Sequence, residues 1–210
     1  MAYDFKKALK DLYAPGADPA LIDLPPANYL AVEGSGDPNE VGGAYQQAIS
    51  ALYAVAYTLK MSHRTDHRIE GFFEYVVPPL EGLWHQADTA IVDLARKSDF
   101  RWTSFLRLPE FVREQDVAWA VETASKKKKM NCSAVHLLSF HEGLCVQALH
   151  TGPFDTEAET VEKMDAWLEE LGYVNDFSPL RRHHEIYLSD PRKTPPERRK
   201  TILRHPVRKT

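Results

Sequence analysis

Three side chains that can exchange protons or bind cations alternate along one segment near the end of the 210-residue chain. The segment 182–188 reads RHHEIYL, a composition typical of a β-strand. Every second side chain of a strand lies on the same face, here those of His183, Glu185 and Tyr187. We expect Ile186 and Leu188 to pack beneath helices, which leaves Glu185 on the opposite face of the sheet.

Glu185 is the candidate for chemistry in this segment. A carboxylate among aromatic and apolar neighbours is costly to bury unless it is hydrogen-bonded or used. Burial raises the pKa of a carboxyl, so Glu185 is a candidate general acid, general base or receptor for a cation. The alternative is a glutamate exposed on the open face of a sheet, and the sequence leaves both open.

A second constellation is VVPPLEGLW at 76–84. Rigid prolines, a flexible glycine and the large indole of Trp84 suit a pocket wall where backbone approaches a ligand. Ordinary core packing of Trp84 beside an edge strand is the alternative. Glu81 in the same segment is a possible second carboxylate, although nothing in the sequence shows that it faces Glu185.

The sequence gives little support for a bound metal ion or cofactor. His63 and His67 have the spacing of two ligands on one helical turn, but no third ligand follows at a recognisable spacing, so we expect no metal. No nucleotide- or phosphate-binding motif occurs, and we expect no organic cofactor. Cys132 and Cys145 are expected to be unlinked, non-catalytic thiols.

Composition and charge exclude several classes of function. A net charge of −4 and a pI of about 6.1 give no overall field that favours nucleic acid or an anionic membrane. The basic residues near the end, among them Arg199 and Arg204, are interpreted as a solvated surface because no aromatic residue interleaves with them. Neither a secretory signal nor a transmembrane run is present, which predicts a cytoplasmic protein.

The order strand, glycine turn, helix, strand, strand occurs twice. Gly36-Asp37-Pro38-Asn39 corresponds to Gly152-Pro153-Phe154-Asp155, and amphipathic patterns predict long helices over 40–60 and 155–171. Weaker patterns predict helices over 86–97 and 110–124 and a strand over 72–77. The prediction is an α+β fold in one domain, 1–210. Two βαββ halves, about 25–110 and 130–210, form an antiparallel sheet with both long helices on one face and a central cleft for a ligand.

With these features, the segments VVPPLEGLW (76–84) and HHEIYLSDPRKTPPERRKTILRHPV (183–207) resemble the GyrI-like small-molecule-binding domains, in particular a stand-alone bacterial group of about this length. The resemblance covers nearly the whole chain. It implies two βαββ (SHS2) modules around a pseudo-two-fold axis, and a relation to effector-binding domains of multidrug-responsive activators and to gyrase-inhibitory proteins. No DNA-binding segment precedes the domain here, so the chain is not predicted to be such an activator.

The resemblance also implies a site. It places the pocket glutamate on Glu185, with Tyr187 beside it and Trp84 from the other half, around a flat, lipophilic, aromatic small molecule. Further wall residues predicted are Glu81, Tyr29, Tyr53, Phe140, Trp119 and His183. Some stand-alone members resemble hydrolases that open the cyclopropane of DNA-alkylating cyclopropanoid compounds. In such a reaction Glu185 would position or deprotonate water, and Tyr187 would donate a hydrogen bond to Glu185 or to the substrate's dienone oxygen.

The sequence therefore leaves three functions open. The chain is a detoxifying hydrolase, or a protein that sequesters or senses such compounds without turnover, or a protein–protein inhibitor like its gyrase-inhibitory relatives. The first two share a pocket. The third needs an acidic, DNA-like surface, which the basic C-terminal end argues against, so we expect no protein partner.

Overall fold

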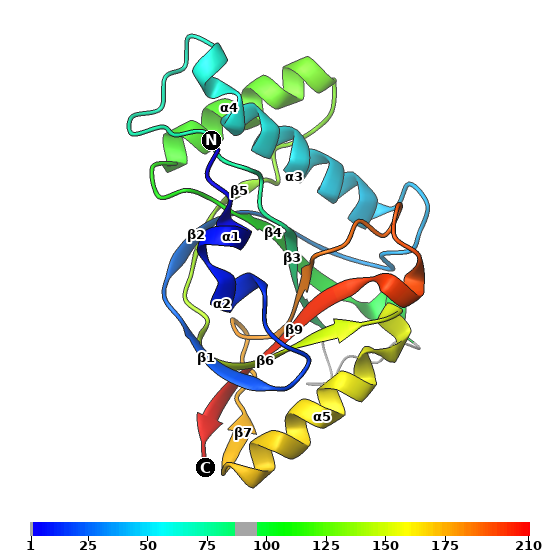
Figure 1. Ribbon diagram of the computed structural model, residues 1–210. Coiled ribbons are helices and arrows are strands. Elements are labelled where there is room, and N and C mark those ends of the chain that lie inside the picture. Colours follow the sequence, from blue (N-terminus) through cyan, green and yellow to red (C-terminus); the bar gives the residue numbers. More distant parts are fainter. Residues whose placement is uncertain (1, 87–95) are drawn as a thin grey trace.

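A strongly curved antiparallel sheet forms the centre of the computed structural model, which describes residues 2–86 and 96–210 (Figure 1). Eight of its strands follow the order β1-β6-β9-β8-β3-β4-β2-β5, and β7 pairs with β9. The strands are β1 (Ala20–Leu24), β2 (Ala27–Ser35), β3 (Leu80–His85), β4 (Arg101–Arg107), β5 (His136–Phe140), β6 (Gly143–Thr151), β7 (Tyr173–Asn175), β8 (His183–Tyr187) and β9 (Lys200–Lys209).

The predicted duplication is confirmed. The series β2, α3 (Ala44–Lys60), β3, β4 is followed, after α4 (Glu114–Lys128), by β6, α5 (Glu157–Glu170), β8, β9. Within the sheet the two series lie in mirrored order, and β3 of the first pairs with β8 of the second. The two strands that carry the candidate site residues are therefore neighbours at the centre.

Each half also lends a strand to the other. The strand β1 comes before the first half but pairs with β6 of the second half, and β5 comes before the second half but pairs with β2 of the first. This exchange extends the sheet at both ends and binds the halves together beyond the central β3–β8 pair.

Both long helices cover the same face of the sheet, as predicted. Directly paired residues of an antiparallel sheet share a face, and the pairings run from Val32 through Ser104, Gly82 and Glu185 to Leu203. Val32 packs in the cluster beneath α3, and Leu203 packs beneath α5. Both ends of this row are therefore under helices, and Glu185 lies between them.

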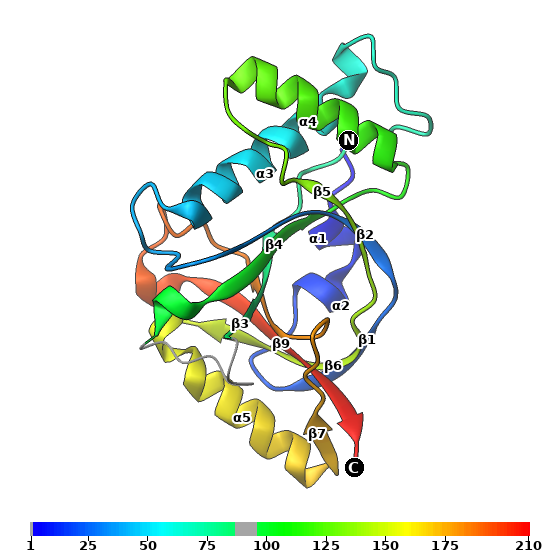
Figure 2. The same ribbon diagram turned by 180° about the vertical axis from the view of Figure 1, so that it is seen from behind.

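The N-terminal segment fills the other face. Two short helices, α1 (Phe5–Ala8) and α2 (Lys10–Tyr13), lie inside the curve of the sheet in both views (Figures 1 and 2). Phe5 and Tyr13 pack there against Ile186 and Ile202. The expectation that Ile186 and Leu188 lie under the long helices is therefore wrong: that face receives α1 and α2, and Glu185 points toward the side of α3 and α5.

The structure contradicts one further prediction, and another concerns residues outside the described part of the chain. The segment 72–77 is not a strand, because its one ladder contact is a bridge between Tyr75 and Tyr3 and its aromatic rings pack against Phe111 and the N-terminal segment instead. The helix predicted over 86–97 falls almost entirely on 87–95, outside the described residues. The helix predicted over 110–124 is α4 and begins four residues later.

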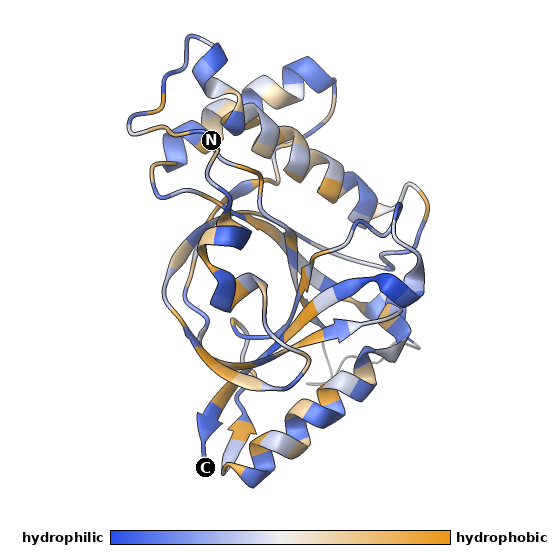
Figure 3. Cartoon of the chain, viewed as in Figure 1, coloured by the Kyte–Doolittle hydropathy of each residue, from blue (hydrophilic) through white to orange (hydrophobic). Residues whose placement is uncertain are grey.

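Hydropathy follows these layers. In Figure 3, α5 alternates between hydrophobic and hydrophilic residues along its length, as expected for a helix with one face on a sheet. Its buried residues Met164 and Leu168 meet Val146 and Ala148 of β6. Among the described residues, no helix is both long enough and apolar enough to cross a membrane.

Candidate active site between the two long helices

The floor of the candidate site is the central pair of strands. Glu185 of β8 lies directly opposite Gly82 of β3, and both side-chain positions face the helices. A Cβ atom on Gly82 would lie 2.9 Å from Nε1 of Trp84 and 3.4 Å from the hydroxyl of Tyr187. The absence of a side chain at Gly82 therefore lets Trp84 and Tyr187 meet over the backbone beside Glu185.

Histidine holds the carboxylate of Glu185 from one side. Nε2 of His183 lies 3.2 Å from Oε1 of Glu185, and Nδ1 of His183 lies 2.7 Å from Nε2 of His205 in β9. Burial, followed by the neighbouring His183, lowers the pKa of His205 well below its usual value, so His205 is neutral. If His205 donates to His183, His183 can donate its own Nε2 proton to Glu185, and this tautomer places no lone pair against the carboxylate.

A second carboxyl group, Glu157, enters from the first turn of α5. One ligand-type atom each of Glu157, His183 and Glu185 lies within 4.8 Å of the others. Burial, and then the charge of Glu185, raises the pKa of Glu157 well above its usual value. Glu157, His183 and Glu185 therefore form a compact cluster of ionisable side chains between the two long helices.

Aromatic side chains surround this cluster. Nε1 of Trp84 donates a 2.8 Å hydrogen bond to the hydroxyl of Tyr187. Tyr45 of α3 lies 5.4 Å from Trp84, and Phe154, just before α5, meets Tyr187 edge-on at 5.9 Å between ring centroids. Burial, and then the charge of Glu185, raises the pKa of Tyr187, so its hydroxyl stays protonated and acts as a hydrogen-bond donor.

The structure therefore brings together four of the predicted site residues and separates the others. Glu185, Tyr187, His183 and Trp84 form one group. On the opposite face of the sheet lie Glu81, Tyr29 and Phe140.

Two predicted wall residues lie on helices away from this group. Tyr53 stacks with Tyr57 along α3 at 6.3 Å. Trp119 of α4 stacks on His67 at 4.1 Å, and His67 bonds Asp116 at 2.9 Å. His67 therefore bonds to Asp116, the aspartate that caps α4.

A buried network of charges occupies the opposite face. His184 lies between two carboxylates, with Nδ1 2.9 Å from Glu142 and Nε2 3.2 Å from Glu81, and Arg204 lies 3.3 Å from Glu142. All four side chains are at most 4% exposed. Two acids and two bases balance one another there. The prediction that Arg204 belongs to a solvated basic surface is therefore wrong, because Arg204 lies in the core.

The N-terminal helices attach to this buried charge network. The hydroxyl of Tyr13 donates a 2.8 Å hydrogen bond to Glu81, and Arg204 donates to the backbone carbonyl of Leu12. Gln147 reaches the carbonyl of Asp11 at 2.7 Å. The network therefore anchors α2 inside the curved sheet, which is a structural role.

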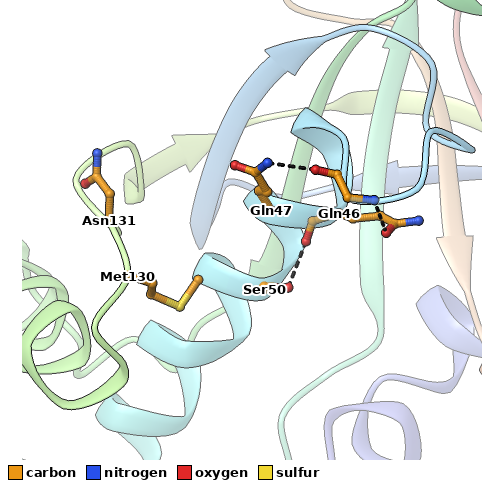
Figure 4. A pocket seen from close by; sticks show the side chains of 6 residues that line it. Gln46, Gln47, Ser50, Met130 and Asn131 are labelled. Carbon is orange, nitrogen blue, oxygen red and sulfur yellow. Dashed lines mark hydrogen bonds between the residues drawn. The ribbon is translucent and has the colours of Figure 1, made fainter.

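Two hollows on the surface of the described residues have linings that do not include Glu185. One, of about 410 Å³, is lined by residues of α3 and by the turn after α4, with the side chain of Met130 directed toward the helix (Figure 4). The other, of about 490 Å³, lies between the N-terminus and Val76. Neither contains a predicted site residue, so the central cleft stays a prediction.

Comparison with known proteins places this geometry in a family. The model of the GyrI-like small molecule binding domain matches residues 17–208, nearly the whole chain. The chain belongs to this GyrI-like family. Among proteins with curated descriptions, none matches the sequence.

Solved structures similar to this chain agree with the fold. The chain is 47% identical to a structure described as a hydrolase from Listeria innocua, with a TM-score of 0.89 over 98% of this chain and 100% of the other. It is 48% identical to an uncharacterized conserved protein from Listeria innocua, with a TM-score of 0.92 over the same shares. The C-terminal domain of EcmrR, at 12% identity, shares the fold with a TM-score of 0.56 over 92% and 98%.

The sequence analysis does not single out three residues of this candidate site, Tyr45, Phe154 and Glu157. The first and last of them lie in the predicted helices over 40–60 and 155–171, and Phe154 lies in the predicted turn before the second helix. An acid in the first turn ordinarily complements the helix dipole, so its type gives no signal of burial. The internal repeat could have pointed to these residues, because the starts of the two long helices occupy equivalent places in the two halves.

Proposed function

We propose that this GyrI-like protein is a hydrolase that adds water to reactive, flat, lipophilic compounds of the cyclopropanoid class, with Glu185 as the general base. The observation that carries the proposal is the setting of the Glu185 carboxylate. Its side chain is 13% exposed, it lies among aromatic rings, and among the described residues no Lys or Arg pairs with it. A carboxylate held by a hydrogen bond to His183 is in a position to accept a proton from a water molecule bound beside it.

The aromatic residues beside Glu185 suit a planar substrate. Trp84, Tyr45 and Phe154 offer ring faces and edges on three sides of Tyr187. Stacking on such rings favours flat apolar molecules and excludes bulk water from the reacting atoms. Relatives described as hydrolases at 47% identity support turnover as well as binding.

The reaction would proceed in one displacement. Glu185 takes a proton from water while the water oxygen forms a bond to the strained methylene carbon. The cyclopropane bond between that methylene and the ring breaks, and its electron pair passes into the conjugated dienone, which becomes a phenolate. General-base assistance of this kind contributes roughly 100- to 10,000-fold to rate.

Glu185→Gln tests this role. The amide keeps the size and much of the hydrogen bonding but removes the basic oxygen, so turnover of a cyclopropanoid substrate should fall by at least about 100-fold with affinity changed much less. The measurement is single-turnover hydrolysis beside ligand affinity, on a variant shown to be folded by its melting curve. Glu33→Gln, the same change at an exposed position in β2, is the matched control and should behave as wild type.

The other outcomes separate the competing functions. If the protein sequesters or senses lipophilic cations, wild type shows no turnover, and Glu185→Gln weakens binding of a cationic ligand while sparing a neutral one of similar shape. If both turnover and binding are unchanged in Glu185→Gln, Glu185 has no part in the site and the proposal is wrong.

A further inference from the structure

The hydrolysis proposed above leaves one proton unassigned. Negative charge grows on the dienone oxygen, and a proton must reach that oxygen before the phenol is complete. The hydroxyl of Tyr187 accepts a hydrogen bond from Trp84 and lies beside Glu185. A phenol whose pKa is raised by burial and by that carboxylate donates a hydrogen bond but does not give up its proton readily.

Glu157 has the opposite properties. Glu157 is 8% exposed, and its Oε1 atom is buried without a hydrogen-bond partner among the residues that the structure describes. The side chain of Thr201 in β9 lies close to the same carboxyl group. A buried polar atom without a partner is costly, so the free oxygen indicates a position where a substrate or water atom binds.

Two carboxyl groups this close cannot both be charged at low cost. His183 hydrogen-bonds to Glu185 at 3.2 Å and lies within 4.8 Å of Glu157, and no Lys or Arg forms an ion pair with Glu157 among the described residues. The other titratable groups that face the pair are Tyr187 on β8, His205 on β9 and Tyr45 on α3, with the exposed Asp155 just before α5. None of these supplies a positive charge, so the pair retains one proton.

From this geometry we propose that Glu157 and Glu185 work as an acid–base pair, in which Glu157 is the general acid that protonates the oxygen leaving the dienone system. The inference rests on the hydrolase function proposed above and deepens it. Glu185 accepts a proton from water, and Glu157 gives its proton to the phenolate oxygen. The proton on Glu185 then passes to Glu157, which restores the pair. The net change is addition of one water to the substrate.

The first test is Glu157→Gln, with Glu159→Gln as the matched control at an exposed position in the same turn of α5. Loss of the acid should lower turnover by about 100-fold while ligand affinity changes much less. It should also abolish the alkaline limb of the pH–rate profile, which reports deprotonation of Glu157, and leave the acid limb that reports protonation of Glu185. Glu157→Asp keeps a titratable carboxyl and should restore part of the alkaline limb.

The second test needs no activity. Titration of the glutamate side-chain carboxyl carbons by NMR should show one carboxyl with a raised pKa in wild type and in Glu159→Gln, and none in Glu157→Gln. If that signal is present and wild type does not hydrolyse the substrate, the proton-sharing pair is supported and the hydrolase function is wrong. If the signal is absent, or Glu157→Gln retains wild-type turnover and pH profile, the acid–base pair is wrong. Activity that requires added Zn²⁺ and is lost with a chelator would also overturn it.

Discussion

Gly82 and Glu185 face one another across the central strand pair, and the missing side chain of the first sets the surroundings of the second. Nε1 of Trp84 and the hydroxyl of Tyr187 occupy the space that a Cβ atom on Gly82 would enter. The glycine in the segment PPLEGLW thus has a defined steric task. It permits the hydrogen bond between Trp84 and Tyr187 that fixes both aromatic side chains beside the carboxylate.

Gly82→Ala should therefore damage the site more than the fold. The new methyl group would lie 2.9 Å from Nε1 of Trp84, so the indole must shift and its 2.8 Å hydrogen bond to Tyr187 must lengthen. Small misplacements of positioning groups can reduce turnover by as much as about 100-fold. We expect a loss of at least about 10-fold in ligand affinity or turnover, measured beside Trp fluorescence. Gly16→Ala, where the methyl group meets only one backbone atom at 3.9 Å, should leave both unchanged.

Tyr13→Phe should loosen the N-terminal helices. The variant removes the hydrogen bond from Tyr13 to the buried carboxylate of Glu81, an interaction of the class that contributes about 1.5–3 kcal/mol. Urea unfolding should show a loss of this size, and hydrogen exchange should rise first at residues of α2. In Tyr3→Phe the ring is 39% exposed, and the same measurements should match wild type. Equal stability of Tyr13→Phe and wild type would mean that the network does not anchor α2.

Stability should pass through a maximum with pH because of His184 and Glu142. Burial opposes a charged His184, but Glu142 and Glu81 outweigh it and raise the pKa of His184 above 6.5. Burial opposes the charge of Glu142 too, but His184 and Arg204 lower the pKa of Glu142 from 4.5 to about 2. The contribution of His184 is full below pH 6.5 and is lost as pH rises through its raised pKa. The contribution of Glu142 is full above pH 4.5 and is lost as pH falls toward 2.

The measurement for this prediction is the free energy of unfolding in urea across both windows. His141→Gln, a change at an exposed histidine in the adjacent turn, should leave the profile unaltered. Histidine NMR should place the imidazole of His184 in its charged form at pH 6.5. A profile that is flat between pH 4.5 and 2 would contradict the assigned role of Glu142.

Alternation along 183–187 predicted correctly which side chains share a face. Alternation alone does not show which face lies under the long helices, because each row of side chains contains groups that can be buried. The N-terminal segment decides the question, because Phe5 of α1 and Tyr13 of α2 pack on the side of Ile186 and Ile202. Lysines stand between these apolar positions in the sequence, so local patterns do not show that the first residues are buried.

The predicted wall residues show a second limit. Tyr29 and Phe140 are aromatic and near the predicted strand ends, which is what a pocket wall would look like in a sequence. Their side-chain parity puts them on the face of Phe105, behind the sheet. Register between strands far apart in the chain decides such a question, and it depends on pairings that local patterns do not determine.

The exchange of β1 and β5 between the halves has a consequence for the origin of the fold. If one half were alone, its outer strand, β6 or β2, would lack the partner that the other half's leading strand supplies, and an unpaired edge of that kind invites another chain. Two copies of a single half could cover these outer strands by trading their leading strands, with the central pair as the contact across the two-fold axis. The present topology is thus that of a strand-swapped homodimer whose two chains have become one, and separate fragments of the two halves, mixed, should reassemble more readily than either should fold by itself.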